Sequence, residues 1–311
     1  MISIEQVIEK AFTTSDLASG GLLNPDQAAR LLQGIFESAV VTVEARREPM
    51  KANKRVIDKI TYTGDILQKP VAVGTEHTNI TEPTTTKVTL DAQEAIVAMD
   101  IAYETIEDNI EGDNLMNTIL QLSSSRLGYE IDKLLLHGNA SGGTGSVLDI
   151  FDGIFVQATT NTSDAAGAVI SDTILNAALK KLPGQYLQDE SQYRFYVSHL
   201  VNLDYVSFLA TKNVNDAFTR YLVEKAVPAF HGIPVKKVGA IQSETVTGTV
   251  PGSKGILINP KNIVWGIHRD IQVEMVRMPR KRVVEVTMTM RMDVKLERED
   301  AVVKITNIKH A

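Results

Sequence analysis

Residues 138–146 are rich in glycine and could be taken for a phosphate-binding loop. The glycines stand at positions 138, 142, 143 and 145. A phosphate cradle needs a loop between a strand and a helix, so that backbone N–H groups and the helix dipole converge on the anion. This loop follows a predicted helix and contains no Gly-Lys-Ser/Thr sequence. We interpret it as a flexible connector and predict no cofactor site there.

Histidine and cysteine give no pattern for catalysis or metal binding. There is no cysteine, and no two histidines have the i, i+4 spacing that places two imidazoles on one helix face. Neither His-Glu-x-x-His nor Gly-x-Ser-x-Gly occurs. A triad built from distant residues would leave no such signature, but nothing favours one. We therefore predict no catalytic residue and no metal site. The histidines concerned are His77, His137, His199, His231, His268 and His310.

Two charged clusters remain. Four acidic residues, Glu104, Glu107, Asp108 and Glu111, precede the longest predicted helix, where a solvated face and the helix dipole explain them better than a carboxylate pair for catalysis. The second cluster is the basic turn, residues 277–282. Its basic residues are Arg277, Arg280, Lys281 and Arg282.

The basic turn allows three interpretations. It could be a soluble hairpin tip, or it could contact an acidic region of another subunit, for which Asp65, Glu76 and Glu82 are candidates. Phosphate binding would need more basic residues, because the chain carries 32 Lys+Arg against 38 Asp+Glu and a net charge of −6. We therefore predict no general or sequence-specific binding of nucleic acid.

The composition fits a folded protein in water. The chain has 311 residues, 43% of them hydrophobic. Without cysteine it suits a compartment that needs no disulfides, which favours synthesis in the cytoplasm. The first residues lack the pattern of a signal peptide and no apolar run approaches 18 residues, so we predict neither secretion by that route nor a membrane span.

The N-terminal third predicts an arm and a long hairpin. Residues 4–12 and 24–38 have helical apolar spacing and flank a Ser-Gly-Gly hinge. Residues 55–63 and 84–98 are rich in Thr, Val and Ile, which predicts strands. The segment between them has neither period. We expect these 95 residues to reach outward and to share no core with the rest of the chain.

The remaining sequence predicts a long helix, an α/β insertion and long strands. Residues 113–137 keep an apolar stripe that includes Leu122 over roughly 36 Å of helix. Short helices and strands alternate over 166–265. From 284 to 296 every even residue is apolar, which predicts a strand of roughly 43 Å with one buried face, paired with residues 271–278. We expect the long helix to lie on that face.

This order of parts resembles the major capsid proteins of tailed bacteriophages with the Hong Kong 97 fold. The resemblance covers nearly the whole chain. The residues that carry it are 21–28 (Gly-Leu-Leu-Asn-Pro-Asp-Gln-Ala), 104–109 (Glu-Thr-Ile-Glu-Asp-Asn), 152–154 (Asp-Gly-Ile), 231–235 (His-Gly-Ile-Pro-Val) and 265–267 (Trp-Gly-Ile).

The resemblance implies an α+β fold in four parts. Residues 1–50 would form an N-arm and 51–95 an extended E-loop hairpin. Residues 96–165 and 266–311 would form the discontinuous P-domain, a long spine helix on long antiparallel strands, and 166–265 the inserted α/β A-domain. The basic turn would be the P-domain loop that a neighbouring E-loop passes.

It also implies a structural protein without catalytic activity, self-assembling from hexamers and pentamers into the icosahedral head that encloses double-stranded DNA. Assembly would take place in the host bacterial cytoplasm, and the product would be part of the virion. A portal and decoration proteins are further implied partners. Because Met1 leads almost directly into the arm, we expect a separate scaffolding protein. The basic turn lacks the Asn needed for a Lys–Asn isopeptide bond, so the shell is expected to be held non-covalently.

Two alternatives stay open. An encapsulin-type compartment shares this fold but encloses cargo enzymes, and a cytoplasmic α/β enzyme of unknown substrate is the more remote possibility.

Overall fold

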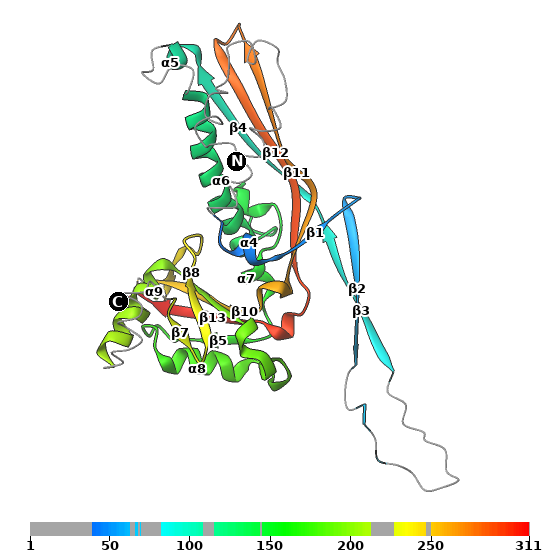
Figure 1. Cartoon of the computed structure of the whole chain (residues 1–311), viewed down its shortest axis with the longest axis vertical. Coiled ribbons are helices and arrows are strands. Elements are labelled where there is room, and N and C mark those ends of the chain that lie inside the picture. The colour runs from blue at the N-terminus through cyan, green and yellow to red at the C-terminus, as the bar shows by residue number, and fades with distance from the viewer. Residues whose placement is uncertain are drawn as a thin grey trace, which may run out of the picture.

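The computed structural model describes residues 39–62, 66–67, 69, 82–107, 115–143, 145–212, 227–246 and 250–310. The molecule is elongated, with a narrow layer of long strands and one long helix, an α/β part beside its lower end, and a ribbon of two strands that projects beyond it (Figure 1). Among the described residues, no helix is long and apolar enough to cross a membrane.

The elongated part contains a four-stranded sheet in the order β1-β11-β12-β4. Its strands are β1 (Arg46–Pro49), β4 (Gln93–Ala102), β11 (Ile263–Met278) and β12 (Val283–Leu296). β1 runs parallel to β11, whereas β11–β12 and β12–β4 are antiparallel. In β12 the even residues from 284 to 296 are buried, as their alternation predicts.

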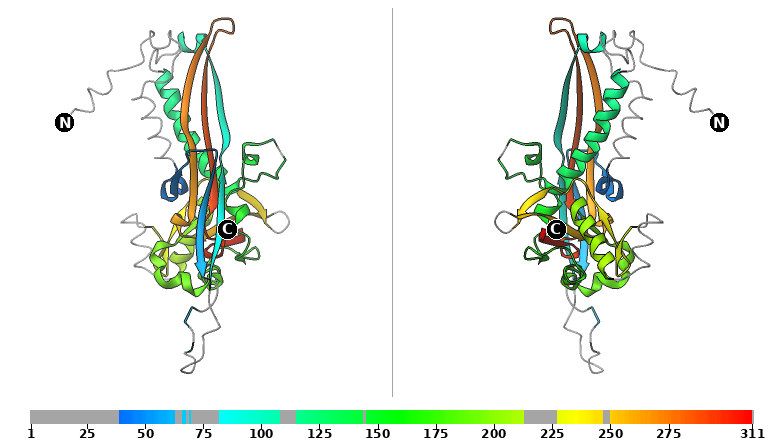
Figure 2. Two further views of the ribbon diagram at one scale, coloured as in Figure 1. Left: turned by 90° about the vertical axis from the view of Figure 1, so that its right-hand side faces the viewer. Right: turned by 90° about the vertical axis from the view of Figure 1, so that its left-hand side faces the viewer.

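The spine helix, α6 (Leu115–His137), lies along one face of this sheet (Figure 2). Leu127, Ile131 and Leu134 pack in one apolar cluster with the buried residues of β12, which confirms the expected layer. Leu122, expected in the apolar stripe, is instead 66% exposed, because the buried stripe runs through Leu120 at that turn. The expected cap, Asp113, lies outside the described residues.

The helix ends where the sequence predicts, because the backbone approaches itself closely there. The Gly138 N–H donates to the Leu134 carbonyl over 2.9 Å. A Cβ at position 138 would lie 2.3 Å from the Phe151 carbonyl oxygen and 2.7 Å from that of Leu134. Only glycine fits at this position.

The α/β part is a seven-stranded mixed sheet with α8 and α9 packed on it. The strand order is β5-β13-β10-β6-β8-β7, with β9 also paired to β10. Its elements are β5 (Thr162–Asp164), α8 (Asp172–Lys181), β6 (Arg194–Val197), α9 (His199–Thr211), β7 (Ala229–Phe230), β8 (Ile233–Lys237), β9 (Ser243–Val246), β10 (Val250–Ile258) and β13 (Val303–Lys309). Short helical segments complete the chain: α5 (Tyr103–Glu107), η2 (Val147–Asp149), α7 (Ile154–Gln157), η3 (Gly184–Gln192), η4 (Pro260–Asn262) and η5 (Glu299–Ala301).

The last strand departs from the expected division of the chain. Residues 266–311 were predicted to belong together with the long strands, but β13 pairs with β10 and β5 in the seven-stranded sheet. β5 likewise joins this sheet from within the predicted segment 96–165. Alternation along a strand shows which face is buried but not which strand is the neighbour, and so the sequence could not assign these two strands.

The ribbon consists of β2 (Lys54–Tyr62) and β3 (Pro83–Asp91), which pair antiparallel over their whole length. The expected strand 84–98 is interrupted at Ala92. Its first half pairs with β2 and its second half, β4, pairs with β12. At this break the Asp91 N–H donates to Oδ2 of the buried Asp293 over 2.8 Å, and the Ala92 N–H donates to the Asn53 carbonyl.

Residues 39–50 have more intramolecular packing than we expected. The two predicted arm helices lie outside the described residues, but α4 (Val41–Glu44) and β1 pack against the rest of the chain. Val41 belongs to the core under the spine helix, and Met50 and Leu90 form a smaller cluster with Val264. The expectation that residues 1–95 share no core is therefore wrong for 39–50 and for the end of β3.

Candidate assembly surfaces

The basic turn connects β11 to β12 at one end of the elongated part. The Lys281 N–H donates to the Met278 carbonyl over 3.1 Å, which closes the turn. Arg282 has a φ of 57°, and its carbonyl accepts the Tyr103 N–H over 3.0 Å. The hairpin tip is thus tied to α5, and its shape is defined within one chain.

Two of the four basic side chains have partners within the chain. Lys281 Nζ lies 2.6 Å from Glu285 Oε1, and this hydrogen bond raises the pKa of Lys281. The Arg277 guanidinium lies 5.1 Å from the centre of the Tyr103 ring, at cation–π distance. Arg280 and Arg282 are exposed and form no ion pair with any residue that the structure describes.

The proposed acidic partners do not meet the basic turn within one chain. Asp65 and Glu76 lie outside the described residues, whereas Glu82 is exposed just before β3. The ribbon and the basic turn lie at opposite ends of the molecule (Figure 1). A contact between them would therefore join different copies, and it stays a prediction.

The ribbon exposes three large apolar side chains to solvent. Val56, Ile60 and Tyr62 are 50%, 65% and 54% exposed and share one face of β2 with the charged Lys54 and Asp58. A two-stranded ribbon has no interior of its own, and exposed large apolar side chains on one face are a feature of interaction surfaces. The sequence signal was the Val, Ile and Thr content of the strand, which predicted the ribbon but not the direction of its faces.

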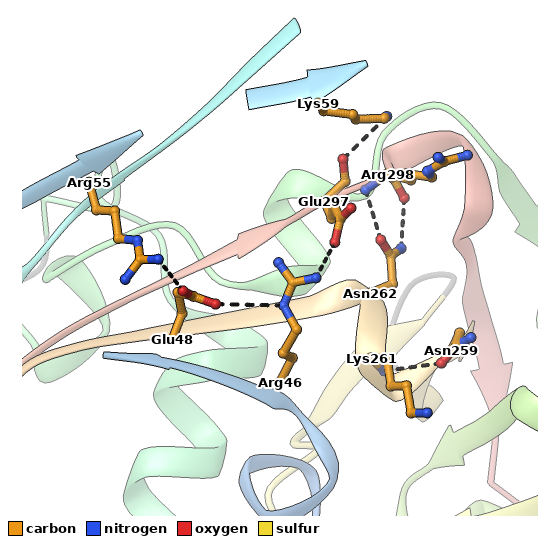
Figure 3. A network of polar contacts seen from close by, with 9 residues as sticks. All are labelled: Arg46, Glu48, Arg55, Lys59, Asn259, Lys261, Asn262, Glu297 and Arg298. Carbon is orange, nitrogen blue, oxygen red and sulfur yellow. Dashed lines mark hydrogen bonds and ion pairs between the residues drawn. The ribbon is translucent and has the colours of Figure 1, made fainter. Parts of the chain in front are cut away.

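A chain of polar contacts fixes the base of the ribbon (Figure 3). We call it the root network. Arg55 of β2 pairs with Glu48, which lies 3.9 Å from Arg46; Arg46 in turn pairs with Glu297 over 2.6 Å. Lys59 also donates to the Glu297 carbonyl over 3.3 Å. The ribbon therefore leaves the body at a direction held by ion pairs on both β1 and the segment after β12.

The same region is where the chain crosses between the two sheets. The Asn262 amide donates to the Arg298 carbonyl and accepts the Arg298 N–H, each over 2.7 Å (Figure 3). The Lys261 N–H donates to Asn259 Oδ1 over 3.0 Å, which caps η4. The two Asn262–Arg298 hydrogen bonds join residues 36 positions apart, and no local pattern in the sequence indicates them.

Sequence reasoning also missed a groove between α6 and β4. It has a volume of about 280 Å³ and an apolar floor with a charged rim. Its lining residues are Val97, Met99, Leu122, Ser123, Arg126, Leu127 and Glu130. Because Leu122 was assigned to the buried stripe, no exposed apolar surface was expected here.

The remaining candidates contribute no reactive arrangement among the described residues. No three His, Asp or Glu side chains in the described ranges gather as metal ligands. In the glycine-rich loop, Asp152 Oδ1 accepts the Ala140 N–H, and Ser146 with Asp149 forms a capping box for η2. These contacts are made within the loop and the turn that follows it. His77, Asp108 and Glu111 lie outside the described residues.

Comparisons with known proteins place these surfaces in context. The profile of the "Phage capsid family" matches residues 19–307. The chain is 33% identical to a Bacillus subtilis (strain 168) protein named "Putative prophage capsid protein", over 98% of this chain and 99% of that protein.

Among solved structures, the fold resembles a chain from the satellite phage P4 procapsid that includes a size determination protein. The TM-score is 0.62 and the sequence identity 13%, and the match covers 98% of this chain and 95% of that one. It also resembles an encapsulin from Synechococcus elongatus PCC 7942, with a TM-score of 0.56, 10% identity and coverage of 99% and 95%. These likenesses confirm the expected α+β fold.

Proposed function

The chain belongs to the phage capsid family, and on that premise we propose that its copies assemble into the icosahedral head of a tailed phage that encloses double-stranded DNA. It is a structural protein of a capsid shell. The observation that supports self-assembly is the β2–β3 ribbon, which extends away from the body with large apolar side chains that no other described part of the chain covers. A neighbouring copy would supply that cover.

We also propose how the chain divides by role. Residues 1–50 would be the N-arm and 51–95 the E-loop. The four-stranded sheet with α6 would be the P-domain. The seven-stranded sheet, now including β5 and β13, would be the A-domain, meeting its copies in hexamers and pentamers. The strand order supports these boundaries at 158–161, 259–262 and 297–302, where the chain passes between the sheets.

The proposal includes further partners and a place of assembly. We propose a separate scaffolding protein, a portal and decoration proteins, with assembly in the host bacterial cytoplasm and the finished shell in the virion. No catalytic activity is part of the proposal. The encapsulin alternative shares the fold, but the sequence relationship is to a capsid protein, and neighbouring genes for a portal and terminase rather than a cargo enzyme would separate the two.

Electron microscopy of the full chain, expressed alone and with a scaffolding candidate, tests the proposal. Shells or capsomers with five- or six-fold symmetry are expected. A chain that stays monomeric under every condition would contradict it.

The predicted contact between the basic turn and a neighbouring hairpin has its own test. Reversing Arg280 and Arg282 to Glu should weaken assembly without unfolding the subunit, because both side chains are exposed. The control reverses the exposed Lys180 and Lys181, which changes the net charge equally on α8. Because salt screens exposed charges, assembly is compared at low and moderate ionic strength. Shell yields equal to those of the control at moderate salt would exclude the contact.

A further inference from the structure

α4 is bound at both of its ends by side chains from different parts of the molecule. At its start, the carboxylate of the buried Asp132 on the spine helix accepts three consecutive backbone N–H groups. These are Val40 over 2.6 Å, Val41 over 3.1 Å and Thr42 over 2.9 Å. Asp132 also accepts the Thr42 hydroxyl.

At the other end of α4, Glu44 reaches the seven-stranded sheet. One carboxylate oxygen accepts the Tyr196 hydroxyl of β6, and the other pairs with Lys236 Nζ of β8. Burial and the Glu44 carboxylate raise the pKa of Tyr196, so the phenol stays protonated and acts as a donor. Tyr196 follows Glu44 by 152 residues in the sequence and Lys236 follows it by 192, and their strands, β6 and β8, are neighbours in the sheet.

We propose that α4 is a clasp that sets the orientation of the α/β part relative to the spine helix, with Asp132 and Glu44 as its positioning residues. The spine helix and the seven-stranded sheet also contribute residues to one apolar cluster, Leu135 and Ile256 among them, and the Gln242 N–H donates to His137 Nε2 at the end of the spine helix. Apolar contacts are non-directional and tolerate sliding. Charge-assisted hydrogen bonds at both ends of a short rigid helix fix a direction.

The clasp also connects this orientation to the N-arm, and this step rests on the proposed function. Residues 1–38 enter the described structure directly before Val40, the residue that Asp132 binds. A neighbouring copy that holds the arm therefore acts on the same four-residue helix that holds Tyr196 and Lys236. The angle between the two parts becomes sensitive to whether the arm is engaged.

The absence of cysteine makes this orientation directly measurable. Cysteines introduced at Leu122 on α6 and Leu203 on α9, both exposed, carry spin labels, and pulsed electron spin resonance reads the distance between them in the full chain. Glu44→Gln and Lys236→Met each remove the ion pair at one end of the clasp. Glu244→Gln is the matched control, because its pair with Lys254 lies within the β9–β10 hairpin and does not join the two parts.

In unassembled chains we expect one narrow distance distribution for the parent and for the control, and a distribution wider by several ångströms for Glu44→Gln and Lys236→Met. Hydrogen exchange of residues 41–45 should also become about tenfold faster in those two variants, as the loss of a charged hydrogen bond implies. Distributions as narrow as the parent's in both variants, or equal widening in the control, would overturn the proposal.

Assembled shells, in which labelled chains are diluted by unlabelled ones, separate this inference from the function on which it rests. The parent's distance should shift on assembly, and the shift should be lost in Glu44→Gln. If the parent forms no shells, the proposed function fails, while the distances in unassembled chains still decide whether the clasp exists. A shift that persists undiminished in Glu44→Gln would refute the link between arm and clasp.

Discussion

His137 should make the subunit lose stability as the pH falls below neutral. It closes the spine helix, its ring lies 5.0 Å from the ring of Phe155, and its Nε2 accepts the Gln242 N–H over 3.1 Å. Burial lowers the pKa of His137 from 6.5 to about 4; the nearby Lys254 and Lys133 also lower it, and Glu244 opposes them. The imidazole is therefore neutral in the folded chain at pH values where it is charged in the unfolded chain.

The size of the effect follows from linkage. A histidine with a depressed folded pKa contributes stability above its unfolded pKa, and this contribution falls as the pH drops from 6.5 to about 4. The whole shift corresponds to about 3 kcal/mol, of which about 2 kcal/mol is lost between pH 7.5 and pH 5. Below pH 4 nothing further is lost from this group.

Urea unfolding of dilute, unassembled chains at pH 7.5 and pH 5 measures the loss. Because carboxylates also titrate, the quantity to compare is the loss in the parent minus the loss in His137→Gln, which can accept the Gln242 N–H but cannot be protonated. Phe155→Leu is the control, because it lowers stability at both pH values and keeps the titrating ring. If the free energy of unfolding falls by the same amount in the parent and in His137→Gln, within about 0.5 kcal/mol, then the idea that His137 is neutral in the folded chain is refuted.

Three further predictions concern stability and are read from urea unfolding. Gly138→Ala should lower the free energy of unfolding by about 1–3 kcal/mol, because the new Cβ meets two backbone carbonyls. Gly184→Ala, whose new Cβ has no atom within 4 Å, should change it by less than about 0.5 kcal/mol. Equal effects would contradict the close approach at Gly138. Met288→Ala should cost about 2–5 kcal/mol, and its neighbour on the other face, Thr287→Ala, about 1 kcal/mol or less; a reversed order would refute the assignment of faces. Asp132→Asn should cost about 2–3 kcal/mol, because the amide nitrogen cannot accept the N–H groups of α4; a cost below about 0.5 kcal/mol would argue against the clasp geometry.

The layers of this fold could be predicted because each rests on a local period. β12 alternates over its whole length and the spine helix carries a stripe, so both elements and their mutual packing followed from the sequence. The order of these elements along the chain then indicated the fold, because it resembles that of the Hong Kong 97 type of capsid protein. The predicted end of the spine helix was accurate because a breaker, Gly138, marks it.

Contacts that depend on distant partners were not accessible. Arg46 and Glu297 are 251 residues apart, and nothing in either neighbourhood indicates the other. Asp132 is a second example. On the helix it is rotated by about 100° from Ile131, beside the stripe, where polar residues are usual, so the sequence does not indicate that it is buried. A buried carboxylate needs donors, and the structure identifies them as three backbone N–H groups and the Thr42 hydroxyl.

The path of the chain between its two sheets has a consequence for the timing of its synthesis. β4 is complete at residue 102, yet β12, its strand partner among the described residues, begins at residue 283. At bacterial rates of translation this gap lasts about 10–40 s. During that time β4 has been synthesised but β12, the strand with which it pairs, has not. The same holds for β1 and its partner β11. The ribbon is held at its base by contacts with Asp293 and Glu297, so these contacts can form only after residue 297 has been made.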